Sequence, residues 1–435
     1  MTATDKRQVH LAAHFPGVNA TTIWSDPSAG SQTEFSSFRH FAATAERGLF
    51  DFIFLAEGLR LREHAGRIHD LDVVGRPDTL TVLAALAAVT ERIGLVGTLN
   101  STFNEPYELA RQLASVDAVS RGRAGWNVVT SSDAFTGANF RRGGFLPHAD
   151  RYRRAGDFVD TAWELWDAAG TGEPVRHESP FFDIEAVFPV PASRQGRPVI
   201  LQAGVSGEGR DVAAKSADAI FSPFAVGDPA REFSDDLTQR LASFGRPRSA
   251  LKILPGATFV IGDDEADAAE RAYAERRAQI SGATAVRSIE ALWGIELDGV
   301  DPDGPLPDVA LLREDVELWQ GRAMRFEDRR NLAEQWAARA EAESLSIREL
   351  AIAVAPPATF VGTASSIAER IDEVVQSGAT DGFILVPSLT PHGLDRFTDE
   401  VVPLLQERGV YRTEYEGTTL RDILGVPLSQ PAALV

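Results

Sequence analysis

Eight short apolar runs recur along the chain, and a helical stretch follows nearly every one of them. The runs are continuously apolar rather than alternating, a pattern typical of strands buried on both faces of a parallel sheet. Repeated strand–helix units build such sheets, and eight units predict a (β/α)8 barrel rather than an open sheet. The predicted strands are residues 9–15, 50–57, 93–100, 124–131, 199–204, 219–224, 251–261 and 382–388.

The chain is longer than such a barrel requires. A bare barrel takes roughly 250 residues, whereas this chain has 435. We therefore expect one α/β domain over residues 1–435 that carries the excess as insertions. The largest insertion is expected between the seventh and eighth strands, at about residues 262–360, packed on the barrel. A smaller hairpin is expected around residues 181–190.

Composition excludes several classes of function. The net charge of −20 argues against a protein that binds nucleic acid by neutralising phosphates. The absence of cysteine excludes disulfides, thiolate metal sites and a cysteine nucleophile. Because no apolar stretch fits a signal peptide or a membrane span, we expect a soluble cytoplasmic protein.

No metal site is expected from the order of residues. The eight histidines do not cluster with carboxylates along the chain. His10 and His14 are four residues apart, but in a strand this spacing separates them by about 13 Å, which is too far for one ion.

The active site of a barrel lies at the carboxyl ends of its strands. Neutral hydrogen-bonding residues, glycines and aromatic residues dominate these ends, which favours a planar polar heterocycle as the ligand. A carboxylate at the end of an apolar strand is unusual. Glu57 is therefore a candidate to contact the ligand or to act as a base, and the alternative is a structural pair with Arg60 or Arg62.

The exit of the fifth predicted strand is rich in glycine. In residues 204–209, GVSGEG, glycines precede a helix, where backbone N–H groups and the helix dipole favour an anion. Ser206 would add a hydroxyl donor to a phosphate, or it is a plain helix cap. The spacing G-x-x-G-x-G is not the dinucleotide fingerprint.

His148 and Tyr152 stand at the start of the long helix after the fourth strand. Their spacing of four residues places them on one face, one turn apart. The pair could hold a phosphate or orient a carbonyl group. The alternative is a capping histidine beside a half-buried tyrosine.

Longer segments resemble a known family. The segment GRAGWNVVTS, preceded by NEPYELARQLASVDAVS and followed by PHADRY, resembles the bacterial-luciferase-like flavin monooxygenases. The similarity is to the branch of nitrilotriacetate, dibenzothiophene sulfone and long-chain alkane monooxygenases and pristinamycin synthase. It runs in order from about residue 8 to 224 and resumes at residues 360–371. Further matching segments are FIFLAEGL, LAAVTERIGLVGTLNSTFNEPY and QAGVSGEGRDVAAKSADAIF.

The resemblance implies a TIM barrel with insertions that binds FMN. A separate NAD(P)H:flavin reductase would supply the FMN in reduced form. Reaction with O2 would then oxidise a small organic substrate through a flavin (hydro)peroxide. The family also implies a homodimer or homotetramer.

The resemblance also assigns site residues. Asn127 and the backbone of Val128 would lie along the isoalloxazine, with Thr98 or Ser101 contacting the flavin from the third strand. Glu57 stands where many members carry Asp. The proton donor stays open, and His14 and Glu57 are candidates because they lie at neighbouring strand ends. The ribityl-phosphate side would be held by His148, Tyr152, Val205, Ser206 and Gly207.

The sequence is compatible with more than one substrate and activity. Aromatic residues near the mouth favour an aromatic or heterocyclic substrate, whereas Arg141-Arg142 would favour an anion if they point inward. The resemblance adds riboflavin as a candidate, because some members of the family degrade it. The alternatives are a deazaflavin-dependent oxidoreductase of the same superfamily, a non-catalytic flavin-binding protein, and a hydrolase that uses Glu57 with an acid such as Asp133. The aromatic residues are Trp24, Phe103, Phe135 and Phe140.

Overall fold

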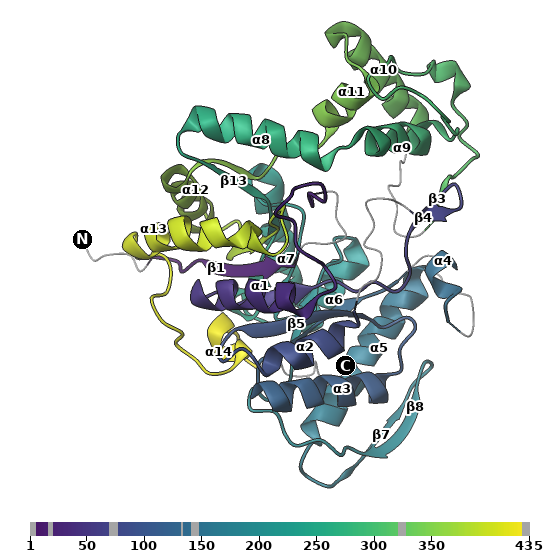
Figure 1. Cartoon of the computed structure of the whole chain (residues 1–435). Coiled ribbons are helices and arrows are strands. Elements are labelled where there is room, and N and C mark those ends of the chain that lie inside the picture. The colour runs from purple at the N-terminus through teal and green to yellow at the C-terminus, as the bar shows by residue number, and fades with distance from the viewer. Residues whose placement is uncertain are drawn as a thin grey trace.

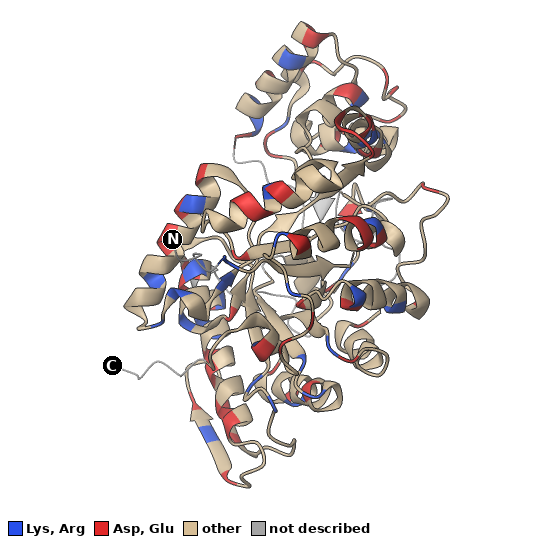
Figure 2. Ribbon diagram, turned by 90° about the vertical axis from the view of Figure 1, so that its left-hand side faces the viewer, with Lys and Arg blue, Asp and Glu red and all other residues tan. Residues whose placement is uncertain are grey.

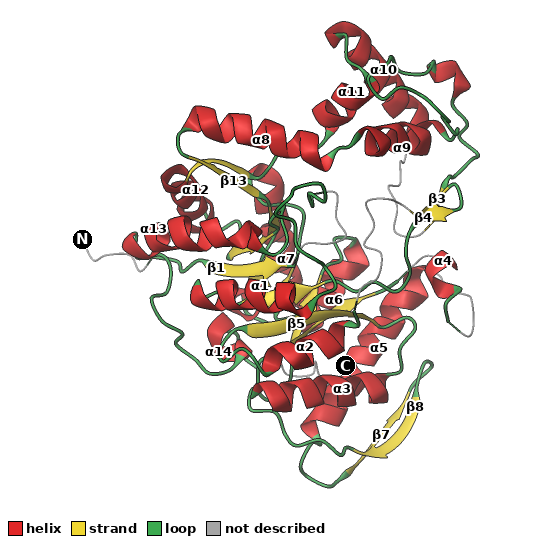
Figure 3. Ribbon diagram, in the orientation of Figure 1, coloured by secondary structure: helices red, strands yellow, loops and turns green. Residues whose placement is uncertain are grey.

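A parallel sheet of short strands occupies the centre of the protein, with helices around it (Figures 1 and 3). The computed structural model describes residues 6–15, 21–68, 77–131, 134–140, 148–320 and 328–428. In hydrogen-bonding order the strands are β11 (Lys252–Ile253), β10 (Ala219–Ile220), β9 (Val199–Gln202), β6 (Ala124–Val129), β5 (Gly94–Asn100), β2 (Phe52–Leu55), β1 (His10–His14), β16 (Gly382–Leu385) and β12 (Gly256–Ala257).

The two edge strands of this sheet, β11 and β12, belong to the same apolar run of the sequence. Leu254 and Pro255 separate β11 from β12 within the seventh predicted strand. β11 pairs with β10, whereas β12 pairs with β16. The sheet is therefore strongly curled, and the predicted α/β class and the parallel order of the strands are confirmed.

A helix follows each strand position of the sheet, as the alternating pattern predicted. Two helix starts carry recognisable residues: the Asp78 side chain accepts a hydrogen bond from Thr81 N at 2.8 Å, and Pro106 occupies the first turn of its helix. The helices that follow strands of the sheet are α1 (Phe35–Arg47), α2 (Thr79–Ala87), α3 (Pro106–Ser120), α5 (His148–Asp167), α6 (Gly207–Ser216), α7 (Gly227–Ser243), α12 (Ala364–Gln376) and α13 (Val402–Glu407). Shorter helical turns are α4 (Ala134–Gly137), η1 (Arg248–Ala250), η3 (His392–Leu394) and η4 (Phe397–Val401).

Alternate residues of each strand face opposite sides of the sheet. On one side, residues such as Phe54, Val96 and Leu201 form a buried cluster among the strands themselves. On the other side, residues such as Leu95 and Trp126 pack against the surrounding helices. Burial on both sides explains why the runs are continuously apolar.

The C-terminal helix α14 (Leu420–Leu424) covers the amino ends of the strands. Leu420 and Leu424 belong to the cluster among the strands. A Cβ added at Gly94, the first residue of β5, would lie 2.5 Å from Leu420 Cδ1. The same Cβ would lie 2.9 Å from the backbone oxygen of Asp51, which favours glycine at that position.

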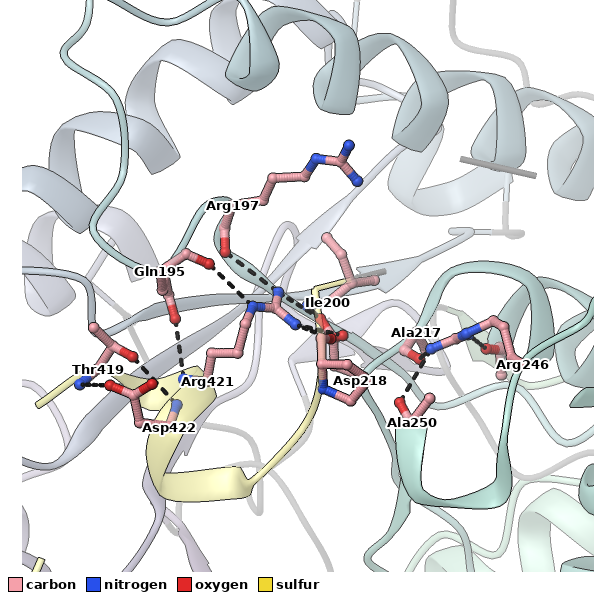
Figure 4. A network of polar contacts seen from close by, with 12 residues as sticks. Gln195, Arg197, Ile200, Ala217, Asp218, Arg246, Ala250, Thr419, Arg421 and Asp422 are labelled. Carbon is pink, nitrogen blue, oxygen red and sulfur yellow. Dashed lines mark hydrogen bonds and ion pairs between the residues drawn. The ribbon is translucent and has the colours of Figure 1, made fainter. Parts of the chain in front are cut away.

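A buried ion pair holds α14 in place (Figure 4). The Arg421 guanidinium donates to Asp218 Oδ1 and Oδ2 at 2.8 and 3.1 Å. Asp218 Oδ2 also accepts from Ile200 N at 2.9 Å, and Arg421 N donates to Gln195 Oε1 at 3.2 Å. Removal of one partner from such a pair leaves a buried charge without compensation.

The segment between β12 and β16 extends away from the sheet (Figure 1). The helices over residues 282–354 share a buried cluster of their own that includes Ile289, Trp293 and Leu350. The predicted end of the seventh strand is wrong, because residues 259–262 leave the sheet and pair with residues 360–363 instead. Apolarity did not reveal this change, since Val260 and Ile261 are also buried. The elements of the segment are β13 (Phe259–Gly262), α8 (Glu265–Gln279), α9 (Gly282–Trp293), η2 (Val309–Leu311), β14 (Trp319–Gln320), α10 (Arg329–Glu343), α11 (Ile347–Val354) and β15 (Phe360–Thr363).

The remaining strands form two small antiparallel structures. β7 (Pro174–Glu178) and β8 (Asp183–Val187) make a hairpin, which starts earlier than the predicted residues 181–190. The short strands β3 (Glu63–His64) and β4 (Arg67–Ile68) follow β2.

Acidic and basic residues are interspersed along the surface helices (Figure 2). Arg240, for example, pairs with both Asp211 and Asp236. Within the described ranges, no helix is both long and apolar enough to cross a membrane.

Candidate active site

The carboxyl ends of β2 and β5 bring Glu57 and Asn100 together. Asn100 Nδ2 lies 3.2 Å from both Glu57 Oε1 and Oε2 and donates to this carboxylate. The orientation of the Asn100 carboxamide is fixed, because its Oδ1 accepts a hydrogen bond from Phe103 N at 2.7 Å and a flip of the amide would break this bond. Burial raises the pKa of Glu57 from 4.5 to about 7, against the lowering effect of the Asn100 hydrogen bonds. Glu57 is therefore a carboxyl group that is close to half protonated at neutral pH.

Sequence reasoning did not predict the contact of Asn100 with Glu57. The contact depends on the parallel pairing of β2 with β5. The alternative pairing of Glu57 with Arg60 or Arg62 is not found among the described residues. Arg60 instead lies 3.8 Å from Glu63.

Thr98 and Asn127 face each other across β5 and β6. Asn127 Nδ2 donates to Thr98 Oγ1 at 3.0 Å, and both residues are buried. Asn127 Oδ1 is buried without a hydrogen-bond partner among the described residues. A buried acceptor of this kind costs free energy until a donor reaches it, so Asn127 offers an acceptor to a ligand at the strand ends.

The neighbouring candidates Ser101 and Val128 have different surroundings. Ser101 Oγ donates to Val129 O at 3.3 Å and Ser101 N donates to the same oxygen at 2.9 Å. The Val128 side chain packs in the cluster between sheet and helices, so a ligand could reach only its backbone. Of the two alternatives on the third strand, Thr98 is the one that contacts Asn127.

The exit of β9 brings together three predicted residues. Ser206 caps α6, and its side chain accepts from Gly209 N at 3.2 Å. Ser206 Oγ also lies 3.4 Å from Tyr152 Oη, to which it donates. Gly207 is the first residue of α6, and a Cβ built there would meet nothing within 4 Å. No described residue therefore blocks this side of the helix N-terminus, where backbone N–H groups favour an anion.

Close packing behind this N-terminus requires glycine. A Cβ added at Gly209 would lie 2.9 Å from backbone atoms of Gly204. The loop therefore folds tightly against the first turn of α6, and Val205 O accepts from Arg210 Nε at 2.8 Å. His148 begins α5, one turn before Tyr152, and its side chain lies outside the described part of the chain.

His14 is the last residue of β1. Its ring contacts the Phe54 ring edge-on, with the ring centroids 5.3 Å apart. Like Asn127, it lies at the carboxyl end of its strand.

Aromatic residues of the predicted mouth pack on one another. Phe103 and Phe140 are stacked, with ring centroids 4.3 Å apart. Arg60 lies over the Phe135 ring, 3.5 Å from its centroid. The Trp24 indole Nε1 is buried without a partner among the described residues. Asp133, Arg141 and Arg142 lie outside the described residues.

The segment of residues 262–360 reaches the loops around this site. β14 pairs with β3, and His64 Nε2 lies 2.6 Å from Glu290 Oε2 of α9 in a buried hydrogen bond. Gln279 Nε2 donates to Thr21 O at 2.7 Å. A hollow of about 350 Å³ lies between this hairpin and α9, and none of the predicted site residues lines it.

Comparisons with known proteins agree with this geometry. The luciferase-like monooxygenase family model matches residues 17–381. N-acetyl-S-(2-succino)cysteine monooxygenase of Bacillus subtilis (strain 168) is 38% identical, over 97% of each chain. Nitrilotriacetate monooxygenase component A of Aminobacter aminovorans is 36% identical, over 93% of each chain. The crystal structure of a riboflavin lyase with modified FMN and riboflavin superposes with a TM-score of 0.74 at 27% identity, covering 96% of each chain.

The family match covers well over half of the chain, and the two relatives cover nearly all of it. The resemblance indicated by the sequence motifs is therefore confirmed. The chain belongs to the luciferase-like monooxygenase family and is a flavin-dependent oxidoreductase.

Proposed function

We propose that this protein is the oxygenating component of a two-component monooxygenase, which uses reduced FMN and O2 to oxidise a small organic substrate. The observation that carries the proposal is the pair of ligand-ready groups at the strand ends. These are the buried, unpartnered Asn127 Oδ1 and the open, serine-capped N-terminus of α6. One suits a polar ring and the other suits a phosphate.

The fold proposal is a closed (β/α)8 barrel with an insertion at about residues 262–360. It is supported by the seventh apolar run, which bonds to β10 through β11 and to β16 through β12. The insertion would act as a lid over the substrate. Its contacts with the loops after β1 and β2, through Gln279 and through β14, support this role.

The residues present fit FMN at both of its polar ends. Ser206 Oγ and the backbone N–H groups of Val205 and Gly207 would hold the phosphate, where the α6 dipole favours negative charge. Tyr152, which already contacts Ser206, would bind on the ribityl-phosphate side together with His148.

The ring would lie along β6. Asn127 Oδ1 would accept a hydrogen bond from the isoalloxazine, and Thr98 would keep that oxygen turned toward the ring by binding Asn127 Nδ2. The backbone of Val128 would complete this side. When bound, reduced FMN supplies the electrons with which O2 is activated and one oxygen atom reaches the substrate.

Glu57 would hold a proton next to the reacting groups. Its pKa of about 7 allows the carboxyl to donate or accept a proton at neutral pH. Asn100 would fix its orientation through the two 3.2 Å contacts. His14, at the neighbouring strand end, is the second candidate for this role.

A separate NAD(P)H:flavin reductase would supply the reduced FMN. Two relatives are by name one part of a larger enzyme, which supports a second component. They are component A of nitrilotriacetate monooxygenase and, at 36% identity, one of the subunits of pristinamycin IIA synthase. The substrate would be a small organic compound, with heterocyclic compounds included, and the assembly a homodimer or homotetramer.

A binding and turnover experiment tests this proposal. Fluorescence titration should give a micromolar or tighter Kd for FMN. With a flavin reductase and NAD(P)H, 18O2 should place one labelled oxygen atom in the product. Ser206→Ala should raise the Kd for FMN about tenfold, because a hydrogen bond to a charged group is lost. Ser243→Ala, on the exposed face of α7, is the matched control and should leave the Kd unchanged.

Three results would contradict the proposal in different ways. Hydride transfer to a deazaflavin without O2 consumption would indicate the deazaflavin-dependent alternative. Tight FMN binding without any product would leave a flavin-binding protein. Activity that persists without flavin under anaerobic conditions would indicate a hydrolase.

A further inference from the structure

Two histidines and an aspartate from opposite ends of the chain meet beside α1. His40 lies in α1, and His392 and Asp395 lie in and just after η3. His40 Nε2 is 2.9 Å from Asp395 Oδ1, and His392 Nδ1 is 2.9 Å from Asp395 Oδ2. One nitrogen of each imidazole thus points at the same carboxylate.

The fold fixes this meeting by backbone contacts. Gly30 N, in the loop before α1, donates to Thr390 O at 2.6 Å, which ties that loop to the segment after β16. Thr44, one turn after His40, donates to Asp395 Oδ1 at 2.8 Å. This hydrogen bond orients the carboxylate, as outer-shell groups orient the ligands of metal sites.

The three groups are suited to a metal ion in number, chemistry and spacing. One ligand atom from each of His40, His392 and Asp395 lies within 4.8 Å of the other two. Metal–ligand bonds of about 2.0–2.2 Å are reached from such separations by small side-chain rotations. The side chains are 39, 53 and 30% exposed, which leaves room for an ion to enter and for water to complete its coordination.

The donor set selects among ions. Two imidazole nitrogens favour Zn²⁺, Ni²⁺ or Cu²⁺, whereas Mg²⁺ and Ca²⁺ prefer oxygen ligands alone. The order of residues gave no sign of this site, because His40 and His392 are far apart in the sequence.

We propose that His40, His392 and Asp395 form a binding site for a divalent transition-metal ion of the Zn²⁺ type. The ion would link α1, which follows the first strand, to the segment that follows the last strand. Because it would bind the folded chain only, it would raise the melting temperature in proportion to the logarithm of its free concentration. The site does not involve the residues proposed to bind FMN.

The chain offers a matched control. His177 also has two carboxylates at 3.0 Å, those of Glu164 and Asp157. These carboxylates contact opposite nitrogens of the ring, so the three groups cannot surround one ion. The cluster around His177 should therefore bind no metal ion, whereas the cluster of His40, His392 and Asp395 should bind one.

The test is equilibrium dialysis of EDTA-treated full-length protein against ZnCl2, with metal counted by mass spectrometry. One equivalent should bind at low micromolar free Zn²⁺, and MgCl2 should give none. His40→Ala and His392→Ala should each weaken binding at least about tenfold, while His177→Ala keeps it. Circular dichroism checks that each variant is folded.

A spectroscopic readout on the unmutated protein guards against variants that do not fold. Co²⁺ in place of Zn²⁺ should give visible absorption bands typical of nitrogen and oxygen ligands, and these should disappear on addition of one equivalent of Zn²⁺. Absence of a bound equivalent in the unmutated protein would overturn the proposal. So would equal binding in all three histidine variants.

Discussion

Replacing Glu57 by glutamine should make the stability of the protein less dependent on pH. Glutamine has nearly the same shape but carries no charge, so it avoids the cost of holding an ionised carboxylate in the buried site beside Asn100. The wild-type protein bears this cost only when Glu57 is ionised. A raised pKa means that the folded state holds the proton more tightly than the unfolded state. Stability is therefore lost as the pH rises from 4.5 to about 7, and the loss is constant above that.

The magnitude follows from the pKa. A carboxyl whose pKa moves from 4.5 to about 7 on folding costs the folded state at most about 3 kcal/mol, at about 1.4 kcal/mol for each pKa unit. Glu57 is partly exposed, so we expect about 2 kcal/mol. Glutamine, like the protonated carboxyl, offers Asn100 Nδ2 one carbonyl acceptor, and the hydrogen bonds to the ionised carboxylate are already included in its pKa. The variant should be within about 0.5 kcal/mol of the wild type at pH 5 and about 2 kcal/mol more stable at pH 9.

Urea-induced unfolding at pH 5, 7 and 9 measures this difference. Tryptophan fluorescence and circular dichroism should report coincident transitions before a free energy is derived. Glu232→Gln removes an exposed carboxylate on α7 and should give a difference from wild type that does not change with pH. A Glu57→Gln difference that is equal at pH 5 and pH 9 would refute the burial argument.

Three further outcomes are expected. If Glu57 donates the proton, kcat should fall above pH 7 in the wild type, and a pH profile of Glu57→Gln should lack that limb. Arg421→Ala should lower the free energy of unfolding by about 3–5 kcal/mol, because it leaves Asp218 charged and buried, and denaturant titration measures this. Gly209→Ala should weaken FMN binding at least about tenfold by forcing the start of α6 off the preceding loop, whereas Gly156→Ala, where a Cβ meets nothing within 4 Å, should not.

Sequence reasoning recovered the sheet because burial on both faces leaves a continuous apolar signal in each strand. The same signal misplaced the end of the seventh strand, since Val260 and Ile261 are buried in a different pairing. Hairpin β7–β8 began earlier than expected because its strands are largely exposed and carry no apolar run.

In the candidate site, too, local sequence patterns predicted some residues, whereas contacts that depend on strand pairing were missed. Ser206 and Tyr152 stand beside recognisable features, a glycine-rich turn and a helix start, and the structure brings them together. The contact of Asn100 with Glu57 depends on pairing between strands, which no local pattern records. The proximity of His40 to His392 depends on the topology of the sheet, because β1 and β16, its first and last strands in chain order, are hydrogen-bonded neighbours.

That adjacency bears on how the chain reaches its fold during synthesis. β1 pairs on one side with β16, so it cannot find that partner until residues 382–385 have emerged from the ribosome. α14 then supplies Leu420 and Leu424 to the apolar interior at the amino ends of the strands. Until these last residues are released, the nascent chain exposes part of that interior, which makes it a target for chaperones and proteases. A fusion partner joined directly after residue 419 would keep the nascent chain in this unfinished state.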